Sequence, residues 1–266
     1  MKTLKYFLLL LFMGLFFYHC STVPITGRSQ LNLIPDSEIN AMSFQQYDEF
    51  IKQNKLSGNK NDLEMVKRVG KNIQTAVETY FAQNNLSKEL EGYQWEFNVV
   101  ESDEVNAWCM PGGKVVVYTG ILPLTKDETG LAVVMGHEIA HAIAQHGNER
   151  MSQGLLQQLG GVALSVALQN EPQQTQELFL TAYGIGTTLG VILPYSRTHE
   201  SEADRLGLIF MAMAGYDPNV AVEFWQRMAA QGGAKPPEFL STHPSDETRI
   251  ADIKNELPEA LKYYKK

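Results

Sequence analysis

Apolar and polar residues follow two different periods along the chain, and these periods predict where helices and strands lie. From Asp36 or Ser37, either of which can cap a helix, apolar positions recur at three- and four-residue spacing through Ile51. The same spacing returns from Leu63 to Val77, beyond a polar break. We therefore expect two amphipathic helices in the first third of the chain.

A strand pattern follows the second helix. Apolar and polar side chains alternate in YQWEFNVV, residues 93–100, which is typical of a half-buried strand. Two more candidate strands, VNAWCM at 105–110 and KVVVYTG at 114–120, are joined by Pro111-Gly112-Gly113, whose turn residues indicate a hairpin. We expect a small antiparallel sheet of about three strands.

Helical spacing then resumes after the third strand and predicts further helices as far as Gly232-Gly233. Thr125-Lys126-Asp127-Glu128 has the T-x-x-E form of a capping box, so the following segment GHEIAHAIAQH, residues 136–146, should lie inside a helix. Later helices are expected from about Thr198 to Ala214, with a stop at Gly215, and from Asp217-Pro218 to Gly232-Gly233.

Between these helices, residues 151–193 carry few charges and contain apolar clusters at 155–168 and 178–193. The second cluster approaches the length of a membrane-spanning helix and contains Gly186-x-x-x-Gly190. Its threonines, its glycines and the nearby Pro194 favour a buried helix or a lid over a functional site instead.

Length and charge narrow the class of protein. The chain has 266 residues, of which 44% are hydrophobic, and this is ordinary globular material. Its net charge is -8 and it has no long basic run, so the charge argues against nucleic acid as a partner. The pattern predicts an α+β, mostly helical fold, with an extended arm at 21–35 and a single domain at 36–266.

The first twenty residues resemble an export signal. Lys2 and Lys5 precede an uncharged run, Tyr6 to Tyr18, that is short for a membrane-spanning helix. The run ends at Cys20, as in bacterial lipoprotein signals, where this cysteine is lipidated and becomes the mature N-terminus. Phe17-Tyr18-His19 lacks the usual small residue before the cysteine, so an uncleaved anchor or a secreted soluble form stays open. With Cys20 lipidated, Cys109 has no disulfide partner and is expected to be a small buried hydrophobe.

Three histidines lie within the helix expected at 136–146. His137 and His141 are four positions apart and so project from one helical face, where both imidazoles can reach a single ion. His146 is nine positions beyond His137 and turns to the opposite face while the helix continues. Two of the three histidines are therefore expected to bind a metal, with another ligand from elsewhere.

The H-E-x-x-H spacing indicates zinc chemistry. Two neutral imidazoles and one carboxylate suit one Zn²⁺ per chain, with a fourth position open for water. Glu138 lies beside that position, where it can take a proton during attack on a carbonyl. Two exposed helical histidines flanking a glutamate would be the alternative interpretation.

A second acidic motif, RTHESEADRLG, begins about sixty residues later. Glu200 and Asp204 share one helical face, while Glu202 points away. Glu200 can complete the metal site, and Asp204 can accept the free N–H of a ligand histidine. Spacing alone leaves His199 open as the third ligand, and an acidic helix start would account for some of these carboxylates.

The two motifs together resemble a family of zinc metallopeptidases. H-E-x-x-H followed by R-x-x-E-x-E-A-D-x-x-G is similar to the family of the CAAX prenyl proteases, the mitochondrial inner-membrane stress protease and the bacterial beta-barrel-assembly-enhancing protease. The resemblance implies a zincin-like fold, with Glu200 as third ligand and Asp204 as the residue that orients a ligand. It runs from about Pro24-Ile25-Thr26-Gly27-Arg28 to Thr242-His243-Pro244 and Arg249.

The same resemblance suggests roles for three further positions. Asn106-Ala107 is similar to the strand along which such proteases bind an extended peptide, although an ordinary edge strand is equally compatible with it. His243 would lie near the zinc, where it either stabilises the oxyanion or closes the open coordination position. Arg249 would buttress this loop or form a structural salt bridge.

The resemblance implies a zinc-dependent endopeptidase that degrades unfolded or misassembled proteins of a bacterial envelope. It would be lipid-anchored and face the periplasm, and Ser21 after the cysteine fits sorting to the outer membrane. A rival hypothesis is an envelope assembly factor that binds client proteins in the same cleft with its protease idle. An exopeptidase would need a site for a chain terminus, and no motif indicates one.

Overall fold

The structure is a computed structural model that describes residues 20–231, 238–243 and 247–265. The expected signal segment before Cys20 and the expected helix end at Gly232-Gly233 lie outside these residues. Contacts divide the described residues into two compact units, one of 20–36 and 145–197 and one of 37–144 together with those described from 198 onward. No helix in the described residues is both long and apolar enough to cross a membrane.

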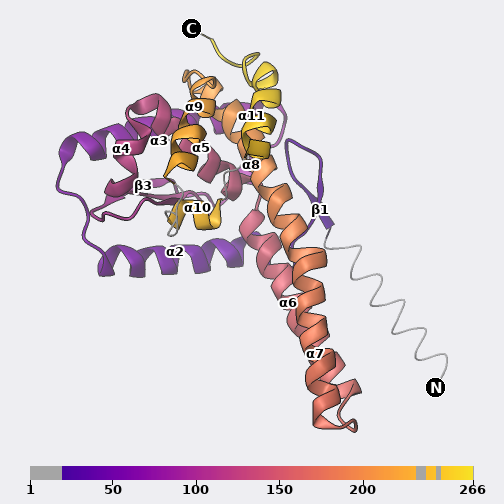
Figure 1. Cartoon of the computed structure of the whole chain (residues 1–266). Helices are drawn as coiled ribbons and strands as arrows, with labels where there is room; N and C mark the ends of the chain where they lie inside the picture. The colour runs from indigo at the N-terminus through magenta and orange to yellow at the C-terminus, as the bar shows by residue number, and fades with distance from the viewer. Residues whose placement is uncertain (1–19, 232–237, 244–246, 266) are drawn as a thin grey trace. The chain divides into compact units, whose positions relative to one another are not determined.

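The larger unit is mostly helical around a small sheet (Figure 1). The sequence prediction of an α+β, mostly helical fold is confirmed. Its elements are α2 (Asp36–Gln53), α3 (Lys60–Gln83), η1 (Ser87–Leu90), β3 (Glu96–Val100), β4 (Ala107–Met110), β5 (Lys114–Tyr118), η2 (Thr119–Ile121), α4 (Leu122–Thr125), α5 (Glu128–Ile143), α8 (Leu193–Met213, from Thr198 onward), α9 (Val220–Ala230), α10 (Glu238–Thr242) and α11 (Glu247–Ala260).

The three-stranded sheet is mixed, so the expectation of a purely antiparallel sheet is wrong. β4 and β5 form the predicted antiparallel hairpin, but β3 pairs with β5 in parallel, in the order β3-β5-β4. The physical reason lies in β5, whose five residues are all buried. A strand that is apolar on both faces belongs at the centre, where it has a neighbour on each side. β4 consequently becomes an edge strand, and α5 packs beside it.

Helix α5 begins at Glu128, and its N-cap is Asp127 and not the predicted Thr125. The side chain of Asp127 accepts a hydrogen bond from the backbone N–H of Gly130 at 2.9 Å, whereas Thr125 belongs to the preceding short helix. Asp127 therefore replaces Thr125 as the N-cap. Lys126 adopts a positive φ of 68°, which interrupts the helical conformation between α4 and α5. From Gly130 to Ile143 every side chain of α5 is buried, between α3, β4 and α9.

Helices α5 and α8 approach each other closely at two glycines. A Cβ added to Gly136 would lie 2.9 Å from the backbone oxygen of Gly207, and one added to Gly207 would lie 2.8 Å from the backbone nitrogen of His137. Any larger residue at either position would separate the helices. This contact sets Glu200 and Asp204, which precede Gly207 on α8, against the histidines of α5.

The smaller unit contains a short hairpin and two long helices. β1 (Cys20–Thr22) pairs antiparallel with β2 (Ser29–Leu31) inside the segment expected to be an extended arm. β2 packs against α6 (His146–Ala167), which lies alongside α7 (Gln173–Thr187), and a π-helical turn, η3 (Thr188–Ile192), follows (Figure 1).

The expectation of a buried helix at 178–193 is wrong. No described side chain of α7 is buried, and Leu178 is 67% exposed. The residues are apolar, but α6 covers one face of α7 and its other faces remain open within the unit. The alternative of a lid over the functional site stays a prediction.

Candidate metal centre

Two histidine side chains project from α5 into the interior of the larger unit. The Nε2 atoms of His137 and His141 are 3.1 Å apart, and both side chains are almost completely buried. Their four-residue spacing on a regular helix brings the rings together, as the sequence predicts. The helix ends at Ile143, and Gln145 adopts a left-handed conformation with φ 56° before α6 begins at His146. His146 is not among the residues that cluster with His137 and His141.

A carboxylate from α8 and a third imidazole complete the cluster. Glu200 places one oxygen 3.4 Å from Nε2 of His137 and the other 3.4 Å from Nε2 of His141. The Nδ1 atom of His243, which follows α10, lies 2.9 Å from Glu200 and 3.1 Å from His137 Nε2. One potential ligand atom from each of the four residues lies within 4.8 Å of all the others. His199 and Glu202 are buried but do not join this group.

The dimensions of this group fit a single divalent cation. Four ligands at about 2.1 Å from a tetrahedral zinc ion lie about 3.4 Å from one another. The contacts quoted above range from 2.9 to 3.4 Å, which is close to that value. Because the groups are nitrogen and carboxylate oxygen atoms, their chemistry also matches zinc. The residues present therefore fit a metal site, with His243 in the place of a fourth ligand.

Asp204 fixes the orientation of His137. Its Oδ1 lies 2.9 Å from Nδ1 of His137, so the imidazole donates its Nδ1–H to the carboxylate and turns its Nε2 toward the cluster. Arg249 binds Asp204 with two hydrogen bonds, from Nε at 2.7 Å and from Nη2 at 2.8 Å. The Arg249 guanidinium also lies 3.5 Å from the ring centre of Trp225 and so is held between α8, α9 and α11.

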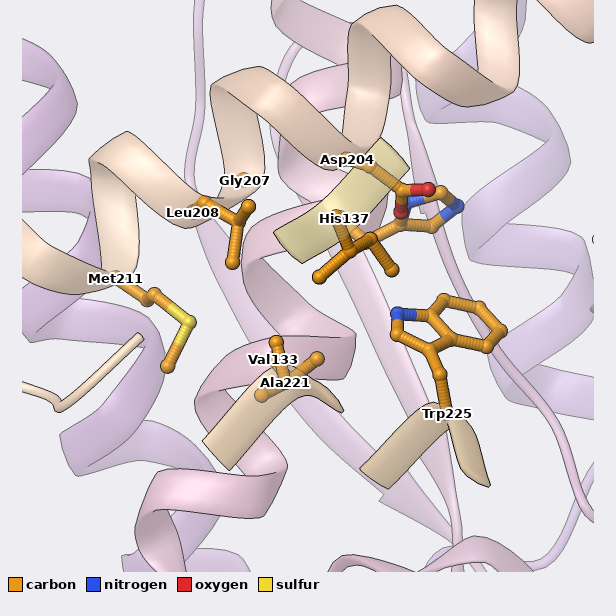
Figure 2. A pocket seen from close by; sticks show the side chains of 9 residues that line it. Val133, His137, Asp204, Gly207, Leu208, Met211, Ala221 and Trp225 are labelled. Atoms are coloured by element: carbon orange, nitrogen blue, oxygen red, sulfur yellow. The ribbon is translucent and has the colours of Figure 1, made fainter. Parts of the chain in front are cut away.

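Arg249 thus forms the structural salt bridge that was the alternative to buttressing the loop of His243. No sequence pattern pointed to Trp225. Figure 2 shows Asp204 beside the His137 ring and Trp225 on α9 below it. A cavity of about 10 Å³ lies behind His137, lined mainly by apolar side chains that include Val133, Leu208 and Met211. It has room for about one water molecule and is too small to hold a peptide.

Burial and hydrogen bonding shift the pKa values of the clustered groups in opposite directions. Burial disfavours the charged form of His137, but hydrogen bonds to Asp204 and Glu200 outweigh it and raise its pKa to about 9. For Glu200, burial is outweighed by hydrogen bonds from three histidines, which hold its pKa well below the usual range. Burial keeps the pKa of His141 well below its usual value. Glu200 is therefore anionic and His141 neutral, as the ligands of a metal would have to be, whereas His137 without metal is protonated at neutral pH and has to release the proton on Nε2 when a metal binds.

Glu138 lies beside the cluster but is not one of its four members. Burial raises the pKa of its carboxyl group, with the neighbouring histidines opposing the rise. Its Oε1 is 3.4 Å from Nε2 of His243 and has no hydrogen-bond partner within the described residues. A buried carboxylate oxygen in this situation can receive a hydrogen bond from a water or substrate group. Glu138 is therefore placed to act as a base next to the cluster.

Of the other predicted positions, Asn106, Ala107 and Cys109 lie on or next to the edge strand β4. Ala107 begins β4 and is buried, and the side chain of Asn106 hydrogen-bonds to Glu104 and to the backbone N–H of Ala107. Burial raises the pKa of the Cys109 thiol well above its usual value, which disfavours the reactive thiolate. Cys20 begins β1 opposite Leu31.

The sequence also matches known proteins. A model of peptidase family M48 matches residues 67–257. The mitochondrial metalloendopeptidase OMA1 of Schizosaccharomyces pombe is 40% identical over 169 residues, which are 63% of this chain and 48% of the relative. The mitochondrial metalloendopeptidase OMA1 of Bos taurus is 34% identical over 262 residues, which are 95% of this chain and 49% of the relative.

A bacterial relative has the same kind of partial match. The beta-barrel assembly-enhancing protease of Escherichia coli (strain K12) is 32% identical over 167 residues, which are 60% of this chain and 34% of the relative. The chain thus spans about half the length, or less, of these curated relatives. The family model covers well over half of the chain and includes all four clustered residues. The chain therefore belongs to peptidase family M48.

Proposed function

We propose that the protein is a zinc-dependent endopeptidase. The observation that carries the proposal is the convergence of His137, His141 and Glu200 in one buried group, with the carboxylate of Glu138 beside it. Membership of a metallopeptidase family and the zinc-compatible distances support the same conclusion. Relatives named as metalloendopeptidases favour cleavage within a chain rather than at its end.

His137, His141 and Glu200 would hold the zinc ion, and Asp204 keeps His137 in the tautomer that ligation needs. When bound, zinc supplies a Lewis acid that polarises the scissile carbonyl and makes a water molecule more acidic. Glu138 accepts a proton from the attacking water as the water oxygen bonds to the carbonyl carbon. The same carboxyl group then delivers that proton to the amide nitrogen as the C–N bond breaks.

The edge strand β4 supplies a surface for the substrate. It is hydrogen-bonded to β5 on one side and packs beside α5, which bears the histidines. We propose that an extended peptide pairs with this strand near Asn106 and Ala107, so that backbone hydrogen bonds provide affinity with little demand on sequence. Unfolded or misassembled proteins would meet this requirement because their backbones are available for pairing.

His243 is placed to control access to the metal. Its Nδ1 occupies the position of a fourth ligand, while its Nε2 faces Glu138. In this arrangement His243 closes the position that a water or a substrate carbonyl needs. We propose that the arrangement is the idle state of the enzyme and that activity requires the His243 ring to move away.

We expect Glu138→Gln to retain zinc and to lose cleavage of a flexible protein such as casein by at least about a hundredfold, because the amide cannot accept the proton. Zinc content by elemental analysis and casein cleavage in solution measure both effects. Glu128→Gln, at the exposed start of the same helix, is the matched control and should cleave normally.

The Glu138→Gln variant also separates the protease from its rival. If it cleaves casein at the rate of the unaltered chain, the proposed base is wrong. If it loses cleavage yet fully replaces the original protein in cells, the cellular role is that of an assembly or chaperone-like factor that binds clients.

We expect His243→Ala to cleave casein several-fold faster than the original chain, because it opens the fourth ligand position without removing His137, His141 or Glu200. Initial rates at saturating zinc measure the effect, since loss of a ligand could otherwise weaken metal binding. A rate more than about tenfold lower would contradict the blocking role and assign His243 to oxyanion stabilisation instead.

We further propose that the enzyme acts in a bacterial cell envelope, lipid-anchored through Cys20, sorted to the outer membrane and facing the periplasm. The signal-like residues 1–20 and Ser21 support this location, and the bacterial relative is named for the assembly of beta-barrels. In this proposal, residues 36–266 form one peptidase domain that degrades misassembled envelope proteins.

Mass spectrometry of the mature N-terminus tests the anchor. After expression in an outer-membrane-bearing bacterium, the protein should begin at a diacylglyceryl-modified Cys20, and Cys20→Ser should abolish the modification. A mature form that begins at any other residue, or an unmodified Cys20, would rule the anchor out.

A further inference from the structure

The helical hairpin of α6 and α7 exposes most of the large apolar side chains that lie on the surface of the described chain. Among the described residues, thirteen large hydrophobic side chains are exposed, and ten of them belong to the segment from Met151 to Leu193. On α6 these form a stripe at four-, four-, three- and four-residue spacing, which keeps them within one narrow sector of the helix. The stripe consists of Met151, Leu155, Leu159, Val162 and Val166.

Helix α7 and the turn after it carry a second stripe. Leu178, Ile185 and Leu189 follow one another at seven- and four-residue spacing and so share a face, with Phe179 beside them. Leu178 and Leu189 are 67% and 62% exposed. The hairpin therefore has an apolar stripe on each of its two helices.

The two stripes point away from each other. The helices meet through Gln157 and Gly160 of α6 and Tyr183 and Thr187 of α7: the Tyr183 hydroxyl donates to the backbone oxygen of Gln157, and the Gln157 amide donates to Thr187. At about 100° per residue, these contacting residues lie roughly opposite the exposed stripe on each helix. The apolar stripes thus form the two outer edges of the hairpin.

Charged residues are nearly absent from the hairpin. Between Arg150 and Arg197 the sequence contains two charged residues, Glu171 in the turn that joins the helices and Glu177 near the start of α7. The remaining exposed positions among the described residues are Gly, Ala, Ser, Thr and Gln, with Asn170 and Pro172 in the turn. An ordinary protein interface has a polar rim with charged residues, whereas contact with acyl chains excludes charge all round.

The hairpin belongs to the same unit as the N-terminal strands. Arg28, just before β2, forms two hydrogen bonds with the buried carboxylate of Glu149 on α6, at 3.1 and 2.8 Å. The backbone of Leu33 donates to Ser152, and Asn148 donates to the backbone oxygen of Ile34. β1 begins at Cys20, directly after the apolar run Tyr6 to Tyr18. The strands that lead from this run are therefore fastened to the base of the hairpin.

We propose that the α6–α7 hairpin lies in the surface layer of a lipid bilayer, with acyl chains against both outer edges. The exposed apolar side chains amount to an area on the order of 1,000 Å², enough to drive such insertion without charge attraction. The polar residues 169–177, which form the turn and the start of α7, lie among the headgroups. No helix has to cross the membrane. A second copy of the chain is a poorer occupant than lipid. It would cover one edge of the hairpin and leave the other exposed, so copies would add to one another without end and would not close into a dimer.

Environment-sensitive fluorescence at single positions tests the proposal. Leu159→Cys and Leu189→Cys, each in the full chain with Cys20→Ser and Cys109→Ala, are labelled with nitrobenzoxadiazole and reconstituted in phosphatidylcholine vesicles that contain spin-labelled lipid. Both labels should be quenched at least about twofold more than a label at Met42→Cys, an exposed apolar position on α2. Because each label reports its own surroundings, attachment through the N-terminal segment does not produce this result.

Salt and lipid charge give a second readout. Since residues 151–196 contain no Lys or Arg, raising NaCl from about 0.05 to 0.5 M, or adding phosphatidylglycerol, should leave the quenching unchanged. Quenching at positions 159 and 189 no greater than at position 42 would overturn the proposal. Shielding of the labels without lipid that grows with protein concentration would overturn it in favour of a second copy.

Discussion

The hydrogen bond from Nδ1 of His137 to Asp204 is the contact on which the metal centre depends. It turns the other nitrogen of His137 toward His141, Glu200 and His243, where that nitrogen can bind a metal once its proton has left. Arg249 neutralises Asp204 and stacks on Trp225, so the carboxylate is not left as an unpaired buried charge. Residues from α5, α8, α9 and α11 together hold the imidazole of His137 in one orientation.

Backbone proximity makes that contact possible. The glycines at 136 and 207 let α5 and α8 touch without side chains between them, and each glycine is adjacent to, or within one turn of, a residue of the metal centre. The position of Glu200 and Asp204 against the histidines therefore follows from two residues that have no side chain. The motif spacing G-H-E-x-x-H and E-A-D-x-x-G contains both the chemistry and the close approach.

Local geometry explains which parts of the site could be predicted. His137 and His141 are four residues apart on one helix, so their proximity needs no information beyond the helical period. The choice of Glu200 over His199 depends on how α8 is rotated against α5, which spacing within α8 does not determine. The resemblance to a peptidase family pointed to Glu200, and the structure brings this residue, and not His199, into the cluster.

Long-range packing accounts for what the sequence did not reveal. The parallel pairing of β3 depends on β5 taking the centre of the sheet, and consecutive strands in sequence give no direct sign of that order. Trp225 supports Arg249 from α9 although no spacing connects them. Apolar residues at 178–193 suggested burial, yet helical period alone does not tell whether protein, lipid or water covers an apolar face.

Metal content tests the central claim most directly. Purified, folded full-length protein, dialysed against buffer with trace zinc and analysed by inductively coupled plasma mass spectrometry, should contain one zinc ion per chain. His141→Ala should lower this content to near zero, whereas His146→Ala, five residues beyond His141 at the start of α6, should leave it unchanged. Folded protein that contains no transition metal and takes up none when zinc is added would contradict the account.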